Sequence, residues 1–417
     1  MKFRYIKNIS GLLGSNVISQ VILLLSLPTV SLLYDPEDFG KFGIVFSIVS
    51  IMAIITLLKS DAYILSLERN NKHYISIYFK SIILSIMLLT TIIFILIIVS
   101  NYFFKNNYTK YYFSVEEFIY IFLIVISYNV CQLTSSMFVN KNKIFKLAQT
   151  NVARSVFLIF FQILFGNIKL VYGLWYAEFL SRIGQIILMS STIFEFLSKI
   201  NTKQIKSGWK NYWIGLKPYS FFAMPASLLS ALTQYLPILF MATIVDLKAA
   251  GLYFMANRII TIPIGMLSQS VSKAFVAEFV QIESENKIKL IRNTIFVLFS
   301  VSLLIVFSYH LLYPLLLKYE PENWNGILDV ISIVIFLTIP ILTISSISQL
   351  FNLLGVQKLL LLTELIKLLF VCSFLLLYQY IGSNAISFYV LLVAIITLGY
   401  FIQLLVLIHP INRLRVK

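Results

Sequence analysis

Long apolar runs, each bounded by short polar or charged segments, recur from one end of the chain to the other. A helix needs about 20 consecutive apolar residues to cross the hydrocarbon core of a bilayer, and these runs have that length. The pattern predicts an all-α integral membrane protein with twelve transmembrane helices. The predicted spans are residues 10–33, 40–58, 76–100, 116–139, 144–166, 170–192, 218–244, 249–272, 293–317, 327–350, 357–380 and 386–408.

The composition agrees with a lipid environment. Of the 417 residues, 59% are hydrophobic and only 12% are charged, whereas a soluble chain carries about 25% charged residues. The first apolar run follows three basic residues, as a signal peptide would. It is longer than a signal peptide's apolar region and has no small-residue cleavage site, so we interpret it as a retained first helix.

The basic residues predict which side of the membrane each loop faces. With both termini cytoplasmic, 25 of the 33 Lys and Arg residues fall in or beside cytoplasmic segments, and six fall in outer loops. An excess of Lys and Arg is typical of the cytoplasmic loops of membrane proteins. Basic loops beside an anionic inner leaflet also account for the net charge of +16 without a nucleic-acid partner.

Similar features recur at a constant offset and indicate an internal repeat. Gly40 and Gly251, which open the second and eighth predicted helices, are 211 positions apart. Gln132 and Ser136 on the fourth helix precede Ser345 and Gln349 on the tenth by 213 positions each. We therefore predict two pseudo-symmetric six-helix bundles around a central cleft. The expected domains are residues 1–195 and 218–417, joined by a basic cytoplasmic linker at 196–217.

Charged residues inside predicted spans are expensive and mark functional sites. Arg258 lies near mid-depth with no acidic residue within four positions on its helix, which favours a water-filled cavity for anions. Pairing with an acid on another helix, such as Glu178, is the alternative. Arg154 and Lys367, which are 213 positions apart, either line the cavity or reach the cytoplasmic face. The candidate cavity cations are Arg258, Arg154, Lys367, Lys59 and Arg182.

Some acidic residues have a basic residue at helical spacing. Glu178 can pair with Arg182 four positions later, and Glu364 with Lys367 three positions later. Polar residues on the same helices either join helices together or line the cleft. The candidate polar lining is Ser15, Ser19, Gln132, Ser136, Gln234, Asn257 and Gln349. Pro225, Pro237, Pro263 and Pro340 are expected to kink their helices.

The sequence favours no enzyme class and predicts no cofactor and no metal. It contains no Gly-x-x-x-x-Gly-Lys-Ser/Thr phosphate loop, no His-Glu-x-x-His zinc motif and no Gly-x-Ser-x-Gly elbow. Cys131 and Cys372 lie in apolar spans without a second ligand nearby, so we expect buried thiols. The outer loops are too short to hold a catalytic site.

Local motifs in both halves of the chain resemble those of bacterial polysaccharide and O-antigen flippases, which belong to the multidrug/oligosaccharidyl-lipid/polysaccharide exporter superfamily. Residues 32–40, Leu-Leu-Tyr-Asp-Pro-Glu-Asp-Phe-Gly, are similar to the family's corner after helix 1, and residues 57–65 resemble its element after helix 2. The second half, from Lys217 through Ala250 and Arg258 to Pro263, resembles the family's Gly-x-Tyr-x-x-Ala-x-Arg stretch, which ends in a proline. Asp61 departs from the family pattern, which usually has Glu at this position.

The resemblance implies a flippase for undecaprenyl-diphosphate-linked oligosaccharide repeat units, precursors of O-antigen (lipopolysaccharide) or capsule, in the bacterial inner membrane. We expect alternating access coupled to H⁺ or Na⁺, with Asp61, Glu178 or Glu364 as ion carriers. The expected partners are this substrate, membrane lipids, a polysaccharide polymerase and a chain-length regulator. A cation-coupled multidrug exporter of the same superfamily is the alternative, and a non-transporting scaffold for glycan assembly is a third reading.

Overall fold

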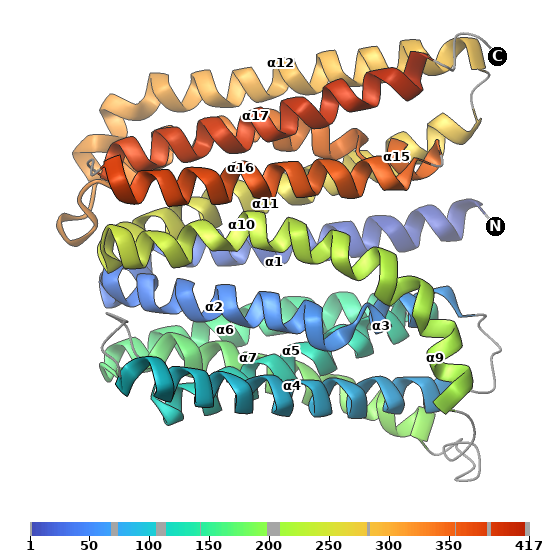
Figure 1. The fold of residues 1–417 in the computed structure, drawn as a ribbon, viewed down its shortest axis with the longest axis horizontal. Coiled ribbons are helices and arrows are strands. Elements are labelled where there is room, and N and C mark those ends of the chain that lie inside the picture. The colour runs from blue at the N-terminus through green and yellow to red at the C-terminus, as the bar shows by residue number, and fades with distance from the viewer. Residues whose placement is uncertain are drawn as a thin grey trace. The chain divides into compact units, whose positions relative to one another are not determined.

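The computed structural model describes residues 2–67, 74–105, 114–141, 143–197, 209–281, 284–354, 356–381 and 385–412. Within these ranges every regular element is a helix, which confirms the all-α prediction (Figure 1). The elements are α1 (Lys2–Leu33), α2 (Pro36–Leu57), α3 (Ser60–Ser66), α4 (Tyr74–Lys105), α5 (Val115–Asn140), α6 (Ile144–Asn167), α7 (Gly173–Leu197), α9 (Trp209–Pro218), η1 (Tyr219–Ala223), α10 (Met224–Ile244), α11 (Leu247–Gln281), α12 (Ser284–Leu316), η2 (Leu317–Tyr319), η3 (Glu322–Trp324), α13 (Ile327–Val334), η4 (Ile335–Leu337), α14 (Thr338–Pro340), η5 (Ile341–Ser345), α15 (Leu350–Leu353), α16 (Gln357–Ile381) and α17 (Ala385–Asn412).

Every predicted span coincides with a long helix or with a run of short ones. In the described part of the chain, ten helices are long and apolar enough to cross a membrane. The other two predicted spans correspond to α1, whose apolar part at Ile18–Leu33 is shorter, and to α7, which is not among the ten. The number twelve therefore stays a prediction.

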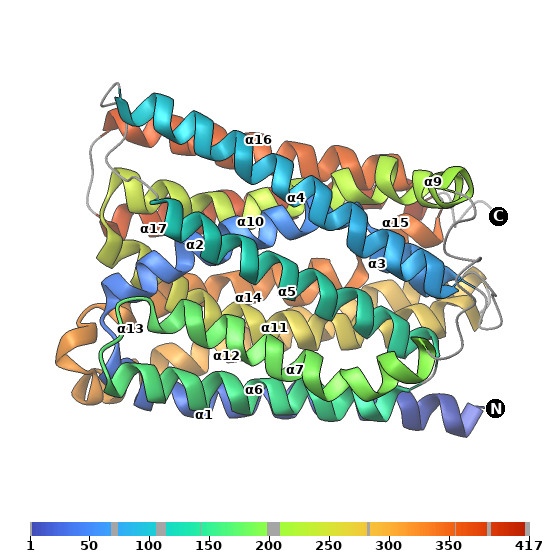
Figure 2. The same ribbon diagram turned by 90° about the horizontal axis from the view of Figure 1, so that it is seen from below.

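The chain divides into two compact units. Unit 1 comprises Met1–Tyr34 and Ile44–Ala231, and unit 2 comprises Asp35–Gly43 and Leu232–Lys417. In unit 1, α6 packs along α1 and α7, and α5 contacts α3, α4 and α7 (Figure 2). In unit 2, α16 packs along α17, and α11 contacts α13 and η5. The domain division predicted from the sequence stays a prediction, but α9 from the predicted linker belongs to unit 1.

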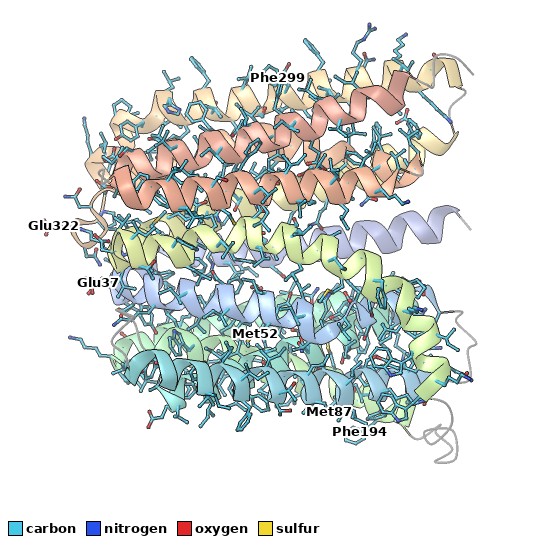
Figure 3. All side chains as sticks on the ribbon, in the orientation of Figure 1. Glu37, Met52, Met87, Phe194, Phe299 and Glu322 are labelled. Atoms are coloured by element: carbon cyan, nitrogen blue, oxygen red, sulfur yellow. The ribbon has the colours of Figure 1, made fainter. Side chains whose placement is uncertain are left out.

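Large apolar side chains cover the outside of each unit. Met87 on α4 is 60% exposed and Phe299 on α12 is 44% exposed, and both point away from their own helix bundle (Figure 3). An aqueous surface rarely carries such a density of exposed apolar groups. These faces are suited to contact with lipid.

The first turns of α2 and α11 cross within unit 2 at Gly40 and Gly251. A Cβ on Gly40 would overlap the carbonyl oxygen of Leu247, and a Cβ on Gly251 would overlap the carbonyl oxygen of Pro36. Pro36 and Leu247 are also 211 positions apart, so each contact repeats the other with the roles exchanged. Reciprocal contacts of this kind are produced by a local two-fold axis. The crossing supports the internal repeat.

Two helices are interrupted along their length. Between α2 and α3, Leu58 and Lys59 both adopt left-handed backbone conformations, with φ of 47° and 61°. Most of the predicted span 327–350 is formed by α13, η4, α14 and η5, and the helix changes from α to π geometry just after Pro340. Proline removes a backbone donor from the helix, which explains the interruption at the position where a kink was expected.

Candidate functional site

Two arginines share one carboxylate between α6 and α7. Arg154 Nη2 on α6 donates to Glu178 Oε1 on α7 at 3.0 Å. Arg182, one turn after Glu178, donates to the same oxygen through its own Nη2. The pairing of Glu178 with Arg182 predicted from their spacing is confirmed. The sequence did not predict that Arg154 joins them.

The cluster is buried, except for one of its members. The side chains of Glu178 and Arg182 are 4% and 5% exposed, whereas that of Arg154 is 32% exposed. The guanidinium of Arg182 also lies 4.5 Å from the centroid of the Tyr128 ring. Two guanidiniums and one carboxylate leave an excess positive charge. Arg154 is the member of this cluster that an anion could reach.

Hydrogen-bond donors remain unused in the cluster. The Nε atoms of Arg154 and Arg182 are buried and have no hydrogen-bond partner. Buried donors of this kind are uncommon, because each loses its hydration without compensation. A phosphate oxygen is a fitting acceptor, since guanidinium groups bind phosphate through two parallel hydrogen bonds.

Two further polar pairs fix the register of α6 against α7. Gln185 Nε2 donates to Asn151 Oδ1 at 2.9 Å, and Lys146 Nζ donates to Ser191 Oγ at 2.8 Å. Lys146 precedes Asn151 on α6, whereas their partners Ser191 and Gln185 occur in the reverse order on α7. The two helices are therefore antiparallel. The position of Arg154 relative to Glu178 is therefore set by contacts on the same helix pair.

Lys367, 213 positions after Arg154, has its charge compensated locally in unit 2. Lys367 Nζ donates to Glu364 Oε1 at 2.7 Å and to Gln403 Oε1 at 3.2 Å. It also lies 4.4 Å from the centroid of the Tyr400 ring. The pairing of Glu364 with Lys367 predicted from their spacing is confirmed. Here one cation meets one carboxylate, in contrast to the excess charge of the Arg154 cluster.

The other candidates of unit 2 lie on α10, on α11 and before α15. Arg258 is half-buried on α11, next to Asn257, whose side-chain oxygen accepts a hydrogen bond from Thr261 Oγ1 at 2.6 Å. Gln234 on α10 and Gln349 before α15 are exposed. The exposed side chains of Gln234 and Gln349 are therefore accessible to a ligand.

The break between α2 and α3 brings other predicted residues together. Lys59 is half-buried in the break, and Asp61 Oδ2 accepts a hydrogen bond from Gln132 Nε2 at 3.3 Å. Ser220 Oγ donates to the carbonyl oxygen of Leu58 at 3.1 Å. Sequence reasoning missed Ser220, because only the π turn after Pro218 brings it to this carbonyl.

The predicted serines have different outcomes. Ser19 on α1 is 6% exposed and its hydroxyl has no hydrogen-bond partner, while Ser136 on α5 is 5% exposed. The side chain of Ser15 lies outside the described residues. In the part of the chain that the structure describes, no group of three or more His, Cys, Asp or Glu residues could hold a metal ion.

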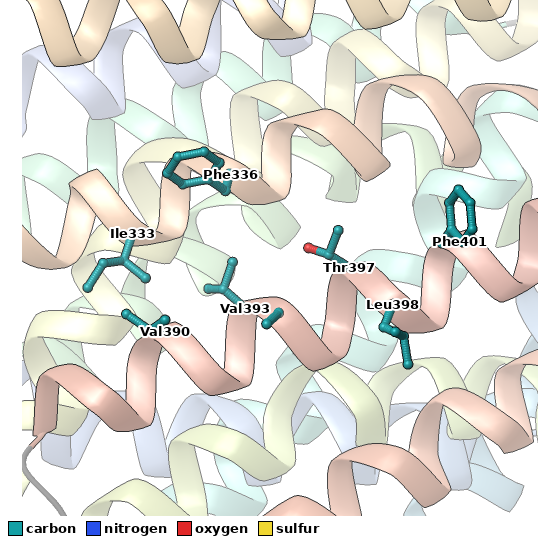
Figure 4. Close-up of a pocket in the computed structure, with 8 residues that line it drawn as sticks. Ile333, Phe336, Val390, Val393, Thr397, Leu398 and Phe401 are labelled. Carbon is teal, nitrogen blue, oxygen red and sulfur yellow. The ribbon is translucent and has the colours of Figure 1, made fainter.

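A pocket of about 610 Å³ lies in unit 2, and none of its lining residues is charged (Figure 4). Its walls come from α13, η4 and α17, and Thr397 contributes the one hydroxyl among the lining residues (Figure 4). The lining residues are Ile333, Phe336, Val390, Val393, Ala394, Thr397, Leu398 and Phe401. Such walls suit a hydrocarbon chain and exclude a charged headgroup.

Comparisons with known proteins agree with this architecture. A family model described as polysaccharide biosynthesis protein matches residues 5–282. No curated protein sequence matches the chain. Among solved structures, the chain resembles an inward-facing multidrug resistance MATE family transporter of the MOP superfamily, with a TM-score of 0.71, 14% identity and coverage of 97% of this chain and 95% of that one.

Two further structures have the same fold. One is a MOP superfamily transporter from Pyrococcus furiosus with a reversed polarity of its binding pocket, and the TM-score is 0.65, with 15% identity and coverage of 98% and 96%. The other is an outward-facing MATE family transporter, with a TM-score of 0.60, 14% identity and coverage of 98% and 96%. At these identities the likeness establishes the fold alone.

Proposed function

Because the chain belongs to the polysaccharide biosynthesis protein family, we propose that it is a flippase for undecaprenyl-diphosphate-linked oligosaccharide repeat units. It carries a precursor of O-antigen or capsule from the cytoplasmic to the outer face of the bacterial inner membrane. The movement is alternating access driven by an ion gradient. A polysaccharide polymerase and a chain-length regulator are the partners that this role requires downstream.

The observation that carries the proposal is the excess positive charge of the Arg154–Glu178–Arg182 cluster. An incoming diphosphate competes for Arg154 with a carboxylate that Arg182 already shares. The guanidinium of Arg154 can therefore bind the phosphate while Glu178 stays paired with Arg182. Because guanidinium geometry matches phosphate oxygens, this exchange gives an anionic headgroup a binding site inside a membrane protein.

The remaining candidates take supporting roles in the proposal. Arg258 and Lys59 supply further positive charge, and Arg182 holds Glu178. Lys367 and Glu364 form the compensated pair of unit 2. Of the predicted polar lining, Gln234 and Gln349 are exposed and Asn257 is half-buried, so these three side chains offer hydrogen bonds to sugar hydroxyls, whereas Ser19 and Ser136 are buried.

For ion coupling, Asp61 is the carboxylate that we favour. Glu178 and Glu364 are both held by cations, so a carrier role for either requires breaking an ion pair. Asp61 instead accepts a hydrogen bond from the Gln132 amide, and it forms no ion pair with any other described residue. Gln132 then positions the carboxylate that binds the coupling ion.

Substitution of Arg154 tests the proposal. In proteoliposomes loaded with a fluorescent undecaprenyl-diphosphate oligosaccharide, Arg154→Gln should lower the transport rate at least tenfold. Arg154→Lys should retain part of the transport rate, since Lys keeps the positive charge but lacks the paired N–H donors of a guanidinium. Lys146→Gln, which removes a cation from the same helix without touching Glu178, is the matched control. Equal transport by Arg154→Gln and Lys146→Gln at equal protein levels would remove the cluster from the mechanism.

The alternative function is a cation-coupled multidrug exporter with the same fold. A cavity for cationic drugs needs an excess of carboxylates, whereas Arg154, Glu178 and Arg182 together leave a positive excess. Drug susceptibility and surface polysaccharide, measured in the same deletion strain, separate the two functions. Loss of drug resistance with unchanged polysaccharide would favour the exporter.

A further inference from the structure

The short helix α9 is held firmly against unit 1. Tyr212 and Leu216 are 2% and 0% exposed and belong to one apolar core with residues of α2, α3, α4 and α5. The Tyr212 hydroxyl lies 3.0 Å from Ser81 Oγ and 3.2 Å from Ser60 Oγ. Gly215 leaves no room for a Cβ beside the Tyr63 ring. The helix is therefore a fixed part of the unit.

The opposite face of α9 combines aromatic, aliphatic and basic side chains. Lys210, Trp213, Ile214 and Lys217 occupy positions i, i+3, i+4 and i+7, which share one face of a helix. Trp213 is 43% exposed, Ile214 is 61% exposed, and both lysines are exposed. We call these four residues the α9 surface.

Further exposed aromatic side chains lie next to the α9 surface. Phe221, in the π turn after α9, is 66% exposed, and Lys217 Nζ lies 5.8 Å from the centroid of its ring. Trp209 is 41% exposed at the start of the helix. Tryptophan rings and lysine side chains both favour the boundary between acyl chains and headgroups, because each has an apolar body and a polar end.

The charges around the α9 surface indicate what covers it. Residues 198–208, which lead into α9, contain three lysines and no acidic residue, so this segment is a poor electrostatic match for Lys210 and Lys217. A bilayer leaflet rich in acidic phospholipid offers the opposite charge together with an apolar layer for Trp213 and Ile214. The charge distribution of the loops puts α9 on the predicted cytoplasmic side.

We propose that the α9 surface binds acidic phospholipid headgroups of the cytoplasmic leaflet, with Trp213 and Ile214 inserted among the first acyl carbons. Lys210 and Lys217 contact the phosphates. Because Tyr212 joins α9 to Ser60 on α3 and Ser81 on α4, binding of α9 to the headgroups also fixes the depth of α3 and α4. The inference does not depend on which molecule the protein transports.

Fluorescence quenching in reconstituted vesicles tests the proposal. The full chain is placed in phosphatidylcholine vesicles that contain an equal fraction of either brominated phosphatidylglycerol or brominated phosphatidylcholine. The fluorescence of Trp213 is obtained by subtracting the emission of the Trp213→Phe variant from that of the wild type. We expect stronger quenching of Trp213 by the brominated phosphatidylglycerol. Lys210→Gln with Lys217→Gln should lower this preference roughly fivefold for each lysine, the equivalent of ~1 kcal/mol each.

The matched control is the pair Lys289→Gln and Lys358→Gln, two exposed lysines of unit 2, which should leave the preference of Trp213 unchanged. Three results would overturn the proposal. One is quenching of Trp213 by aqueous iodide but by neither brominated lipid. Another is equal quenching by both lipids, and the third is an equal effect of the two lysine pairs.

Discussion

Gly40 and Gly251 touch where α2 and α11 cross, and a Cβ on Gly251 would lie 2.9 Å from the backbone nitrogen of Gly40. The same Cβ would overlap the carbonyl oxygen of Pro36. Backbone atoms cannot move aside as a flexible side chain can. The crossing therefore requires glycine at both positions.

Replacing Gly251 by Ala should destabilise the protein. Overpacking of this kind costs typically ~1–3 kcal/mol, which should lower the melting midpoint in detergent by several degrees. Gly265→Ala on the same helix is the control, because a Cβ there meets no atom within 4 Å. Since Ala is the better helix former by roughly 0.5–1 kcal/mol, this variant should melt at the same temperature as the wild type or higher. A Gly251→Ala protein that melts like Gly265→Ala would show that the helices do not cross here.

Glu178→Gln should be among the most destabilising single substitutions in unit 1. It leaves Arg154 and Arg182 without their shared carboxylate, and breaking a buried ion pair costs roughly 3–5 kcal/mol. Arg154→Gln should cost less, because its side chain is 32% exposed and Glu178 keeps Arg182. Thermal melting of the two variants in detergent provides the comparison. The prediction is wrong if Arg154→Gln is the more damaging change.

Lys59→Gly should stabilise the protein relative to Lys59→Ala. Both substitutions remove the same charge, but only glycine adopts the left-handed conformation at φ 61° without steric cost. The difference should be about 1 kcal/mol, the usual cost of this conformation for a residue with a Cβ. Parallel unfolding curves of the two variants measure it. Coincident curves would mean that the break relaxes when Lys59 is replaced.

Tyr212 should contribute to stability in a pH-dependent way. Burial raises the pKa of Tyr212 above its ordinary value of 10.0. Below pH 10 the hydroxyl is protonated in both states, so its contribution is complete. As the pH rises through the folded pKa, the unfolded chain has already lost the proton and the contribution disappears.

Tyr212→Phe should therefore cost stability at pH 7, roughly 0.5–1.5 kcal/mol for each lost hydrogen bond, and this cost should shrink above pH 10. Melting midpoints of the wild type and the variant between pH 7 and 11 provide the measurement. Tyr319→Phe, at an 83% exposed position, is the control. A cost for Tyr212→Phe that stays constant up to pH 11 would contradict the prediction.

The helix positions could be predicted because a bilayer leaves few choices. A chain that crosses hydrocarbon must satisfy its backbone within each segment, so long apolar runs become helices. Pairs on a single helix, such as Glu178 with Arg182, follow from the same regularity. Contacts between helices do not, because they depend on how two surfaces pack. For this reason the approach of Arg154 to Glu178 and the anchoring of Tyr212 were visible only in three dimensions.

The break at Leu58 and Lys59 was also beyond sequence reasoning. Neither residue is a glycine, and an unbroken helix is the lower-energy local choice for both. Ser220 from the π turn binds the carbonyl of Leu58, and Asn140 donates to the carbonyl of Leu67 at 2.7 Å. These tertiary contacts hold both ends of α3 and compensate for the local cost.

The shared carboxylate of Glu178 also has a consequence for biogenesis. α7 carries Glu178 and Arg182 in its interior and is not among the ten described helices that qualify as membrane spans by length and composition. Arg154, which completes the cluster, lies on α6, 24 positions before Glu178, and only a short connection separates the end of α6 at Asn167 from the start of α7 at Gly173. We therefore expect the translocon to release α6 and α7 into lipid together as a hairpin, since Arg154 on α6 would otherwise enter the bilayer without its carboxylate partner on α7.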